Sequence, residues 1–369
     1  MKRLEVLSIA CALLSGACSF AFGELTFQEL GKGSDHRIVV ANDLLEVQFE
    51  PRRGGGIRHL IGKTDGFDRV HSQNRFLLDM FMRQPYPGEM QEANYEFEII
   101  DERPRRVGVR MRRTAAVSPH DGIRLFKTVW INSGSRSLTA AYQFLNASAA
   151  YRSFSYWTQH FAVAGESEVN DRYVRPATDR LDVVPFPGGD RYLDVVERPA
   201  AGWTAVIDPL ESIGTAFVLD FNYLRWLYNA FSASTVEWFT DQITIGPGQS
   251  WTTEFFIIPF SGFDSLAFAS DRLLADSVVD RRDGGLRVRH RLMAVNEPIL
   301  DLMIHAAALS TDGVASDGSL SVGVIGPEPV ELEQHIPFEN ATNQMVLTIL
   351  LGVGGEFGTY FVNLADGEG

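Results

Sequence analysis

The stretch that decides the fold runs from residue 38 to residue 60 and reads IVVANDLLEVQFEPRRGGGIRHL. Two runs rich in β-branched and aromatic residues flank Gly54–Gly56, and such runs are typical of strands. Glycine adopts positive φ without a Cβ clash, so a glycine triplet can reverse the chain tightly. The stretch therefore predicts a hairpin near the start of the chain.

Two later segments have the same strand, turn, strand pattern. Gly246–Ser250 separates the apolar run 242–245 from the run 251–259, and we expect a late hairpin there. The run 127–131 and the run 138–146, which ends in Asn146, predict a hairpin in the middle of the chain.

Together these segments resemble the galactose-mutarotase-like β-supersandwich, over roughly residues 35 to 262. The first hairpin of that fold often reads asparagine, apolar strand, proline, glycine pair. Its late hairpin often turns on proline-glycine and then glutamate or glutamine with serine. The resemblance implies a sugar-handling domain, which we place at 24–262.

The remaining strand signals support an all-β fold. Short runs with period-2 alternation recur without a long helical pattern between them, which excludes an alternating βαβ fold and leaves a sandwich or barrel. In the first domain, further strands are expected at 95–100, 106–111, 123–131, 203–207 and 214–219.

A helix and linker are expected at 263–283, because Leu266, Leu273 and Leu274 belong to an apolar stripe at helical spacing. A second β module then covers 284–369, with strands at 286–292, 299–308, 319–324, 329–335, 345–351 and 359–364. It resembles an immunoglobulin-like sandwich at 358–367, where Tyr360 would bury its hydroxyl at a corner. Asp366-Gly367 should turn into a last strand, so the module is either incomplete within a longer polypeptide or complete without that strand.

Residues 1–23 have the basic start, apolar run and small-residue end of a secretory signal. Both cysteines, Cys11 and Cys18, lie within it, so the exported chain would form no disulfide. Lipidation at Cys18 is an alternative, although Leu14 stands one place too far away for it. No later run is long enough for a membrane span, so we expect a periplasmic or secreted protein.

The formal charge of −14 at pH 7 argues against nucleic acid or an anionic membrane as the partner and fits a neutral ligand better. The eight histidines are spread singly along the chain, and the acidic residues lack the spacing of a calcium loop. Neither a metal nor a cofactor is therefore expected.

Sugar sites need flat aromatic rings and paired polar groups. The run 151–161 supplies Tyr156, Trp157 and His160. His160 occupies the position that resembles the mutarotase histidine which protonates the ring oxygen; the alternative is a histidine of the core.

Glu237 stands just before the proline-glycine turn, where the resemblance implies the general base, and Trp238 follows it. With His160 it would complete an acid–base pair. Arg75, after Asn74, is similar to the arginine that holds a sugar hydroxyl in that family. A second aromatic group, Tyr223, Trp226 and Tyr228, belongs either to the core or to a binding platform.

The sequence thus predicts an exported carbohydrate-binding protein of a polysaccharide-processing system, with Arg75, Tyr156, Trp157, His160, Glu237 and Trp238 at its site. One alternative is an aldose-1-epimerase-like or lyase-like enzyme that uses His160 and Glu237. Another is a non-binding scaffold of a larger glycan-active protein, since a fold alone does not fix a function.

Overall fold

The computed structural model describes residues 24–177, 180–186, 193–230, 233–282, 284–310, 313–337, 346–352 and 356–363. Within these ranges the chain has no α-helix, and two short 3-10 helices lie at Gly33–Asp35 and Glu168–Asn170. The all-β prediction is confirmed. The predicted signal at 1–23 and the predicted turn at 366–367 lie outside the described residues.

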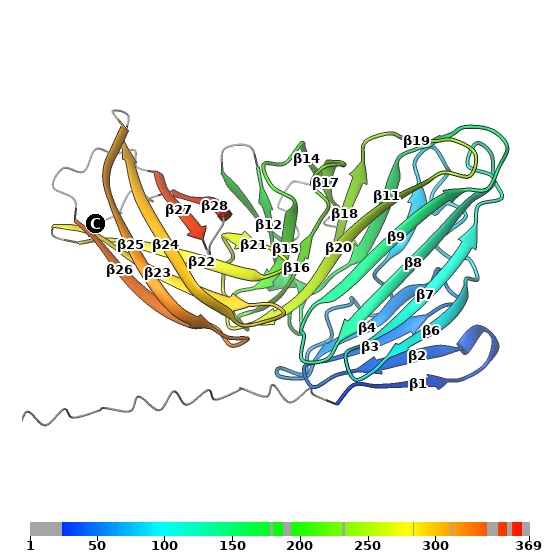
Figure 1. The fold of residues 1–369 in the computed structure, drawn as a ribbon, viewed down its shortest axis with the longest axis horizontal. Helices are drawn as coiled ribbons and strands as arrows, with labels where there is room; N and C mark the ends of the chain where they lie inside the picture. Colours follow the sequence, from blue (N-terminus) through cyan, green and yellow to red (C-terminus); the bar gives the residue numbers. More distant parts are fainter. Residues whose placement is uncertain are drawn as a thin grey trace, which may run out of the picture.

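Four sheets build the first part of the molecule (Figure 1). A four-stranded sheet contains β1 (Thr26–Leu30), β2 (Arg37–Ala41), β3 (Leu45–Glu50) and β4 (Gly56–Gly62). A five-stranded sheet has the order β14 (Leu193–Glu197), β17 (Leu224–Ala230), β18 (Thr235–Thr240), β11 (Tyr156–Phe161) and β5 (Leu78–Phe81). A two-stranded sheet pairs β10 (Arg152–Phe154) with β19 (Ile243–Ile245).

The largest sheet has nine antiparallel strands and packs against the five-stranded one. Its order is β13 (Leu181–Pro185), β12 (Arg172–Pro176), β15 (Trp203–Asp208), β16 (Ile213–Val218), β20 (Ser250–Ser261), β9 (Leu138–Asn146), β8 (Ile123–Asn132), β7 (Arg106–Thr114) and β6 (Glu96–Glu102). The main apolar core lies between these sheets and the four-stranded sheet, with Val47, Phe76, Val129 and Phe217 fully buried in it.

The first and central hairpins form as predicted. Strands β3 and β4 pair across the glycine turn, where Gly54 has φ 73°. A Cβ on Gly54 would stand 1.9 Å from the carbonyl oxygen of Gln91, so a side chain has no room there. Strands β8 and β9 pair over their whole length.

The late hairpin prediction is wrong in its pairing, although both strands exist. Strand β19 pairs with β10, whereas β20 lies between β9 and β16 in the nine-stranded sheet. The Gly246–Ser250 turn therefore carries the chain from one sheet to another. Asn146 holds this crossing, because its Nδ2 donates to the carbonyl of Ile245 at 3.0 Å.

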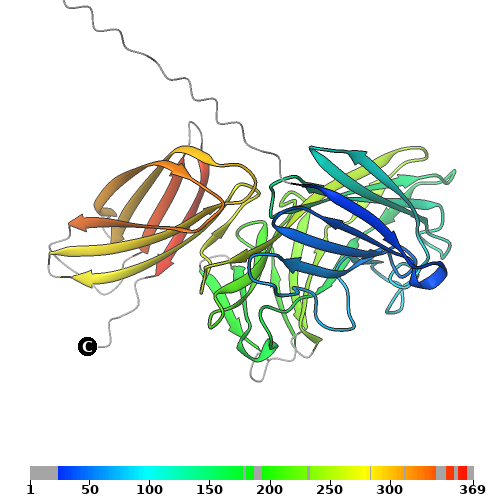
Figure 2. The ribbon, with the colours of Figure 1, turned by 90° about the horizontal axis from the view of Figure 1, so that it is seen from below.

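The second module consists of two four-stranded antiparallel sheets, seen beside the first part in Figure 2. One contains β21 (Phe268–Ala269), β22 (Leu273–Arg282), β23 (Gly285–Ala294) and β26 (Val330–Pro337). The other has the order β25 (Gly313–Ile325), β24 (Ile299–Ser310), β27 (Val346–Gly352) and β28 (Glu356–Asn363).

The predicted helix at 263–283 is wrong, because β21 and β22 occupy this segment. Leu273 and Leu274 are both fully buried, but neighbouring strand residues point to opposite sides, so each belongs to a different apolar cluster. The spacing of the apolar residues in this segment is compatible with a helix as well as with strands.

Tyr360 is buried, as predicted, and its hydroxyl lies 2.7 Å from Ser277 Oγ on β22. Its partner is thus a side chain of the facing sheet rather than a loop carbonyl. The immunoglobulin-like assignment of this module remains a prediction.

Candidate functional site

The face to which each side chain points decides which predicted residues can form a site. Successive residues of a strand point to opposite faces of its sheet. On β11 and β18 one face turns toward the nine-stranded sheet and the other, called the outer face below, turns away from it. The pairs Gln159–Glu237 and His160–Val236 lie opposite each other across the two strands, so Glu237 and His160 belong to different faces.

The inner face carries Tyr156, His160 and Trp238. All three are buried, with exposed fractions of 1%, 0% and 4%. Tyr156 donates its hydroxyl hydrogen to Asp79 at 2.8 Å, and Trp238 stacks on the His160 ring with centroids 4.6 Å apart. These side chains build the core between the two sheets and cannot reach a ligand on the outer face.

His160 has the environment of a core histidine. Its Nδ1 accepts a hydrogen bond from the backbone N–H of Leu77 at 3.4 Å, and its ring also contacts Phe76 and Phe217. Burial, followed by the charge of Lys127, holds its pKa well below the ordinary value, so the ring is neutral.

The predicted acid–base pair of His160 and Glu237 is therefore corrected. An acid and a base that serve one substrate must face the same space. Here a sheet separates the two side chains, and the alternative of a core histidine describes His160.

Glu237 lies at the centre of the outer face and is 1% exposed. Its carboxylate accepts hydrogen bonds from Trp157 Nε1 at 2.6 Å, Gln159 Nε2 at 3.0 Å and Thr235 Oγ1 at 2.6 Å. Burial nevertheless raises its pKa to about 7, because desolvation of the charge outweighs these three donors, which act in the opposite direction.

Aromatic rings surround Glu237 on the same face. Trp157 stacks on Phe239 with centroids 5.2 Å apart and planes 13° apart. Trp226 and Tyr228 on β17 contact the same Phe239 ring, at 5.5 and 6.0 Å, edge to face. Trp157, Trp226 and Tyr228 are all partly exposed, whereas Phe239 is buried.

Tyr86 extends the aromatic group from a loop. Its ring lies 6.2 Å from Trp157, and 61% of the residue is exposed. Partial burial raises its pKa, and the charges of Glu237 and Glu92 raise it further.

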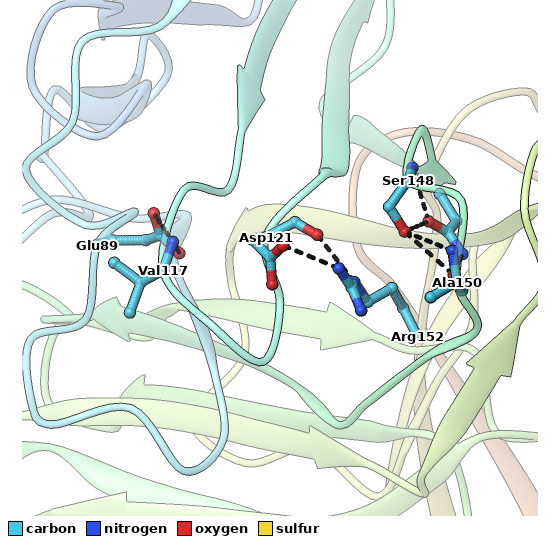
Figure 3. Close-up of polar contacts among 7 residues, drawn as sticks. Glu89, Val117, Asp121, Ser148, Ala150 and Arg152 are labelled. Carbon is cyan, nitrogen blue, oxygen red and sulfur yellow. Dashed lines mark hydrogen bonds and ion pairs between the residues drawn. The ribbon is translucent and has the colours of Figure 1, made fainter.

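Glu89 fastens the loop that carries Tyr86. Its carboxylate accepts from the backbone N–H groups of Ala116 at 2.7 Å and Val117 at 3.2 Å, and from Gln84 Nε2 at 2.9 Å. Figure 3 shows Glu89 directed at Val117 and, in a nearby loop, Arg152 directed at Asp121.

Arg75 lies just before β5, the strand that pairs with β11. It is 6% exposed and pairs with Glu92, whose charge also acts on Tyr86. Its backbone carbonyl accepts from Phe161 N–H at the end of β11, at 3.2 Å. Of the six predicted site residues, Trp157 and Glu237 thus share the outer face, whereas Tyr156, His160 and Trp238 lie on the inner face. Arg75 contacts Glu92, and its place in the site stays a prediction.

Other regions offer less. Among the described residues, no group of three or more His, Cys, Asp or Glu side chains could hold a metal ion, and no helix could span a membrane. A surface depression of about 290 Å³ lies on the nine-stranded sheet, lined by Glu96, Phe97, Glu98, Arg110, Arg112 and Phe126. The charged side chains that line it form two ion pairs with each other, Arg110–Glu98 and Arg112–Glu96.

No protein-family model matches this chain, and no curated protein matches it in sequence. Among solved structures, a TPR-domain containing protein from Parabacteroides distasonis is similar, with TM-score 0.50 and 11% identity, over 62% of this chain and 47% of that one. The chain therefore spans about half the length of that protein.

Two galactose mutarotase-like proteins are also similar. The protein from Clostridium acetobutylicum has TM-score 0.48 and 11% identity, over 64% of this chain and 99% of that chain. The protein from Lactobacillus casei has TM-score 0.44 and 13% identity, over 61% and 100%. The solved structures to which this chain is similar thus include galactose mutarotase-like proteins, and identities this low bear on the fold alone.

Proposed function

We propose that the outer face of the five-stranded sheet binds a carbohydrate around Glu237. The observation that carries the proposal is a buried, fixed carboxyl group beneath partly exposed aromatic rings. Rings such as Trp157 stack on the C–H face of a sugar, and a fixed oxygen selects its hydroxyl groups.

The polar atoms at the centre can accept further hydrogen bonds. Glu237 Oε2 accepts from Trp157, and a carboxylate oxygen can accept two such bonds. Gln159 Oε1 is buried without a hydrogen-bond partner in the described chain. Both residues are buried, so sugar hydroxyls would reach these acceptors only if the covering side chains moved; buried polar atoms are rarely left unsatisfied.

Arg75 and Tyr86 form the polar border of the proposed site. Both lie beside Glu92, whose side chain is 58% exposed. The arginine and the phenol would contact hydroxyl groups farther from Glu237. Export to the periplasm or the medium belongs to the same proposal and rests on the signal pattern at 1–23.

A glycan array tests the proposal. The mature chain should retain at least one class of glycan, and Trp157→Ala should weaken that binding by about tenfold or more, the effect of about 1.4 kcal/mol. Trp130→Ala is the matched control, because Trp130 is also a partly exposed tryptophan but lies on the nine-stranded sheet.

Two results would contradict the proposal. An array on which the wild-type chain retains no glycan would favour the non-binding scaffold. Equal binding by the Trp157 and Trp130 variants would place any glycan site elsewhere.

A further inference from the structure

We infer that the outer face takes a neutral oligosaccharide rather than a single sugar, with a second stacking position at Trp226. This inference rests on the proposed function, since it extends the same site away from Glu237. Three features of the structure support it: a row of rings, a bulge in β17 and paired charges along the row.

The rings form a row that crosses the strands. From Tyr86 to Trp157 the centroids are 6.2 Å apart, from Trp157 to Phe239 5.2 Å, and from Phe239 to Trp226 5.5 Å. Trp157, Phe239 and Trp226 stand on the neighbouring strands β11, β18 and β17. Such a row is longer than one pyranose ring, and its two partly exposed tryptophans stand on either side of the buried Phe239.

A bulge in β17 turns Trp226 toward the outer face. Leu224 pairs with Thr240, but Trp226 pairs with Phe239, so Arg225 is an extra residue. If Arg225 paired regularly instead, Trp226 would lie opposite Trp238 and share the inner face with Leu224, which is buried in the core. Bulges re-aim side chains and are frequent beside functional sites.

The bulge is held in place rather than left loose. The backbone carbonyl of Arg225 accepts from the N–H of Arg198 at 2.7 Å. The chain therefore departs from regular pairing and leaves a large apolar ring partly exposed, with the Arg225 guanidinium 4.8 Å from the ring centroid. A tryptophan needed only for packing would gain more from the inner face, because burial removes apolar area from water.

Charges beside the row occur in pairs of opposite sign. Arg225 approaches Glu197 at 3.9 Å and Arg198 approaches Asp241 at 3.6 Å, while Arg75 pairs with Glu92. No excess positive charge faces the row among these residues. An acidic sugar chain would meet as much repulsion as attraction, whereas the hydroxyl groups of a neutral chain can bond to both signs.

Titration calorimetry with sugars of one to six units tests the inference. The probes are β-1,4-linked glucose, β-1,4-linked mannose and α-1,4-linked galacturonic acid series. We expect a neutral series to bind, with affinity rising about tenfold or more from one unit to four. Trp226→Ala should remove this rise, so that its loss of affinity is at least about tenfold larger for four units than for one. Phe221→Ala is the control, because Phe221 is an exposed aromatic residue in the turn before β17.

The outcomes distinguish a failure of this inference from a failure of the proposed carbohydrate site. Equal affinity at every length, or an unchanged rise in the Trp226 variant, would overturn the inference and leave the proposed function standing. Preference for the galacturonic acid series would overturn the neutral class. If no probe binds, the inference fails, and an empty glycan array would then remove the proposed function as well.

Discussion

Glu237 combines two properties that rarely occur together on a sheet surface. It is nearly inaccessible, yet it lies on the face that points away from the core and is surrounded by partly exposed rings. Its three hydrogen-bond donors fix the carboxyl group in one orientation. A fixed carboxyl group with a pKa of about 7 can present either a donor or an acceptor to a ligand at neutral pH.

The raised pKa predicts a pH-dependent cost of folding. The folded state holds the Glu237 proton more tightly than the unfolded state, so ionisation destabilises the fold. The cost begins near the ordinary pKa of 4.5 and is complete above about 7. By 1.36 kcal/mol per pKa unit it reaches at most about 3 kcal/mol.

Glu237→Gln tests this cost, because the amide stays neutral. Relative to the wild type, its free energy of unfolding should improve by up to about 3 kcal/mol from pH 5 to pH 8, measured by urea denaturation. Glu98→Gln, at an exposed position, should show no such change. If the free energies of unfolding of Glu237→Gln and the wild type differed by the same amount at pH 5 and pH 8, the raised pKa of Glu237 would be contradicted.

At the residue scale the sequence located the right strands but not the right faces. Tyr156 and Trp157 are neighbours in one strand, and so are Glu237 and Trp238. The two side chains of each pair must therefore point to opposite faces of the sheet. If the alternation of faces along each strand had been applied to the predicted site, Tyr156, His160 and Trp238 would have been assigned to a different face from Trp157 and Glu237. The face of Trp226 could not be predicted, because it depends on the bulge at Arg225 and no residue pattern indicates that bulge.

At the scale of elements, Lys127 holds three segments together from the interior. Its Nζ donates to the carbonyls of Gly54 at 2.8 Å and Leu77 at 2.9 Å, and to the Asp79 carboxylate at 2.6 Å. The first glycine turn, strand β5 and strand β8 meet at this fully buried ammonium group. Burial lowers the pKa of Lys127, and the charge of Asp79 opposes that shift.

Lys127→Met should destabilise the protein by about 3–5 kcal/mol, because it leaves the Asp79 carboxylate buried without its partner. The double variant Lys127→Met/Asp79→Asn should recover part of that loss, since it removes the buried charge. Denaturant unfolding of the wild type and the two variants measures both effects. A single variant as stable as the wild type would show that the pair contributes nothing to the fold.

Elements whose pattern was unambiguous were predictable, and those defined by long-range contacts were not. The strands from β6 to β9 follow from alternation and turn chemistry. The partner of β19 could not be predicted, because the Gly246–Ser250 turn is compatible both with a hairpin and with a crossing between sheets. The apolar segment at 263–283 fits a helix until the facing sheet is known.

At the scale of the whole molecule, a shared apolar cluster joins the two parts. Ile258 and Phe260 of β20 pack with Leu274 of β22 and Met293 of β23. Polar contacts accompany this cluster, since Ser135 Oγ and Ser137 Oγ both donate to Asn296 Oδ1 at 2.6 Å. The junction therefore resembles a domain core rather than a flexible linker.

This junction predicts one cooperative unfolding transition. Leu274→Ala should lower the midpoint for the whole chain, with a loss of about 2–5 kcal/mol, as expected for a buried leucine. Calorimetry and hydrogen exchange of both parts can follow it. Two separate transitions, of which only the later part responds to the substitution, would show that the parts fold independently.

The central claim is that a carbohydrate contacts the outer face and not the interior, and the indole N–H resonances report on it directly. Of the six tryptophans, Trp157 donates its N–H to Glu237 on the outer face, whereas Trp238 is buried against His160. Titration of isotope-labelled protein with the best-binding glycan should shift the Trp157 resonance, assigned through Trp157→Phe, and leave Trp238 in place. Saturable binding that leaves Trp157 unmoved would contradict the account.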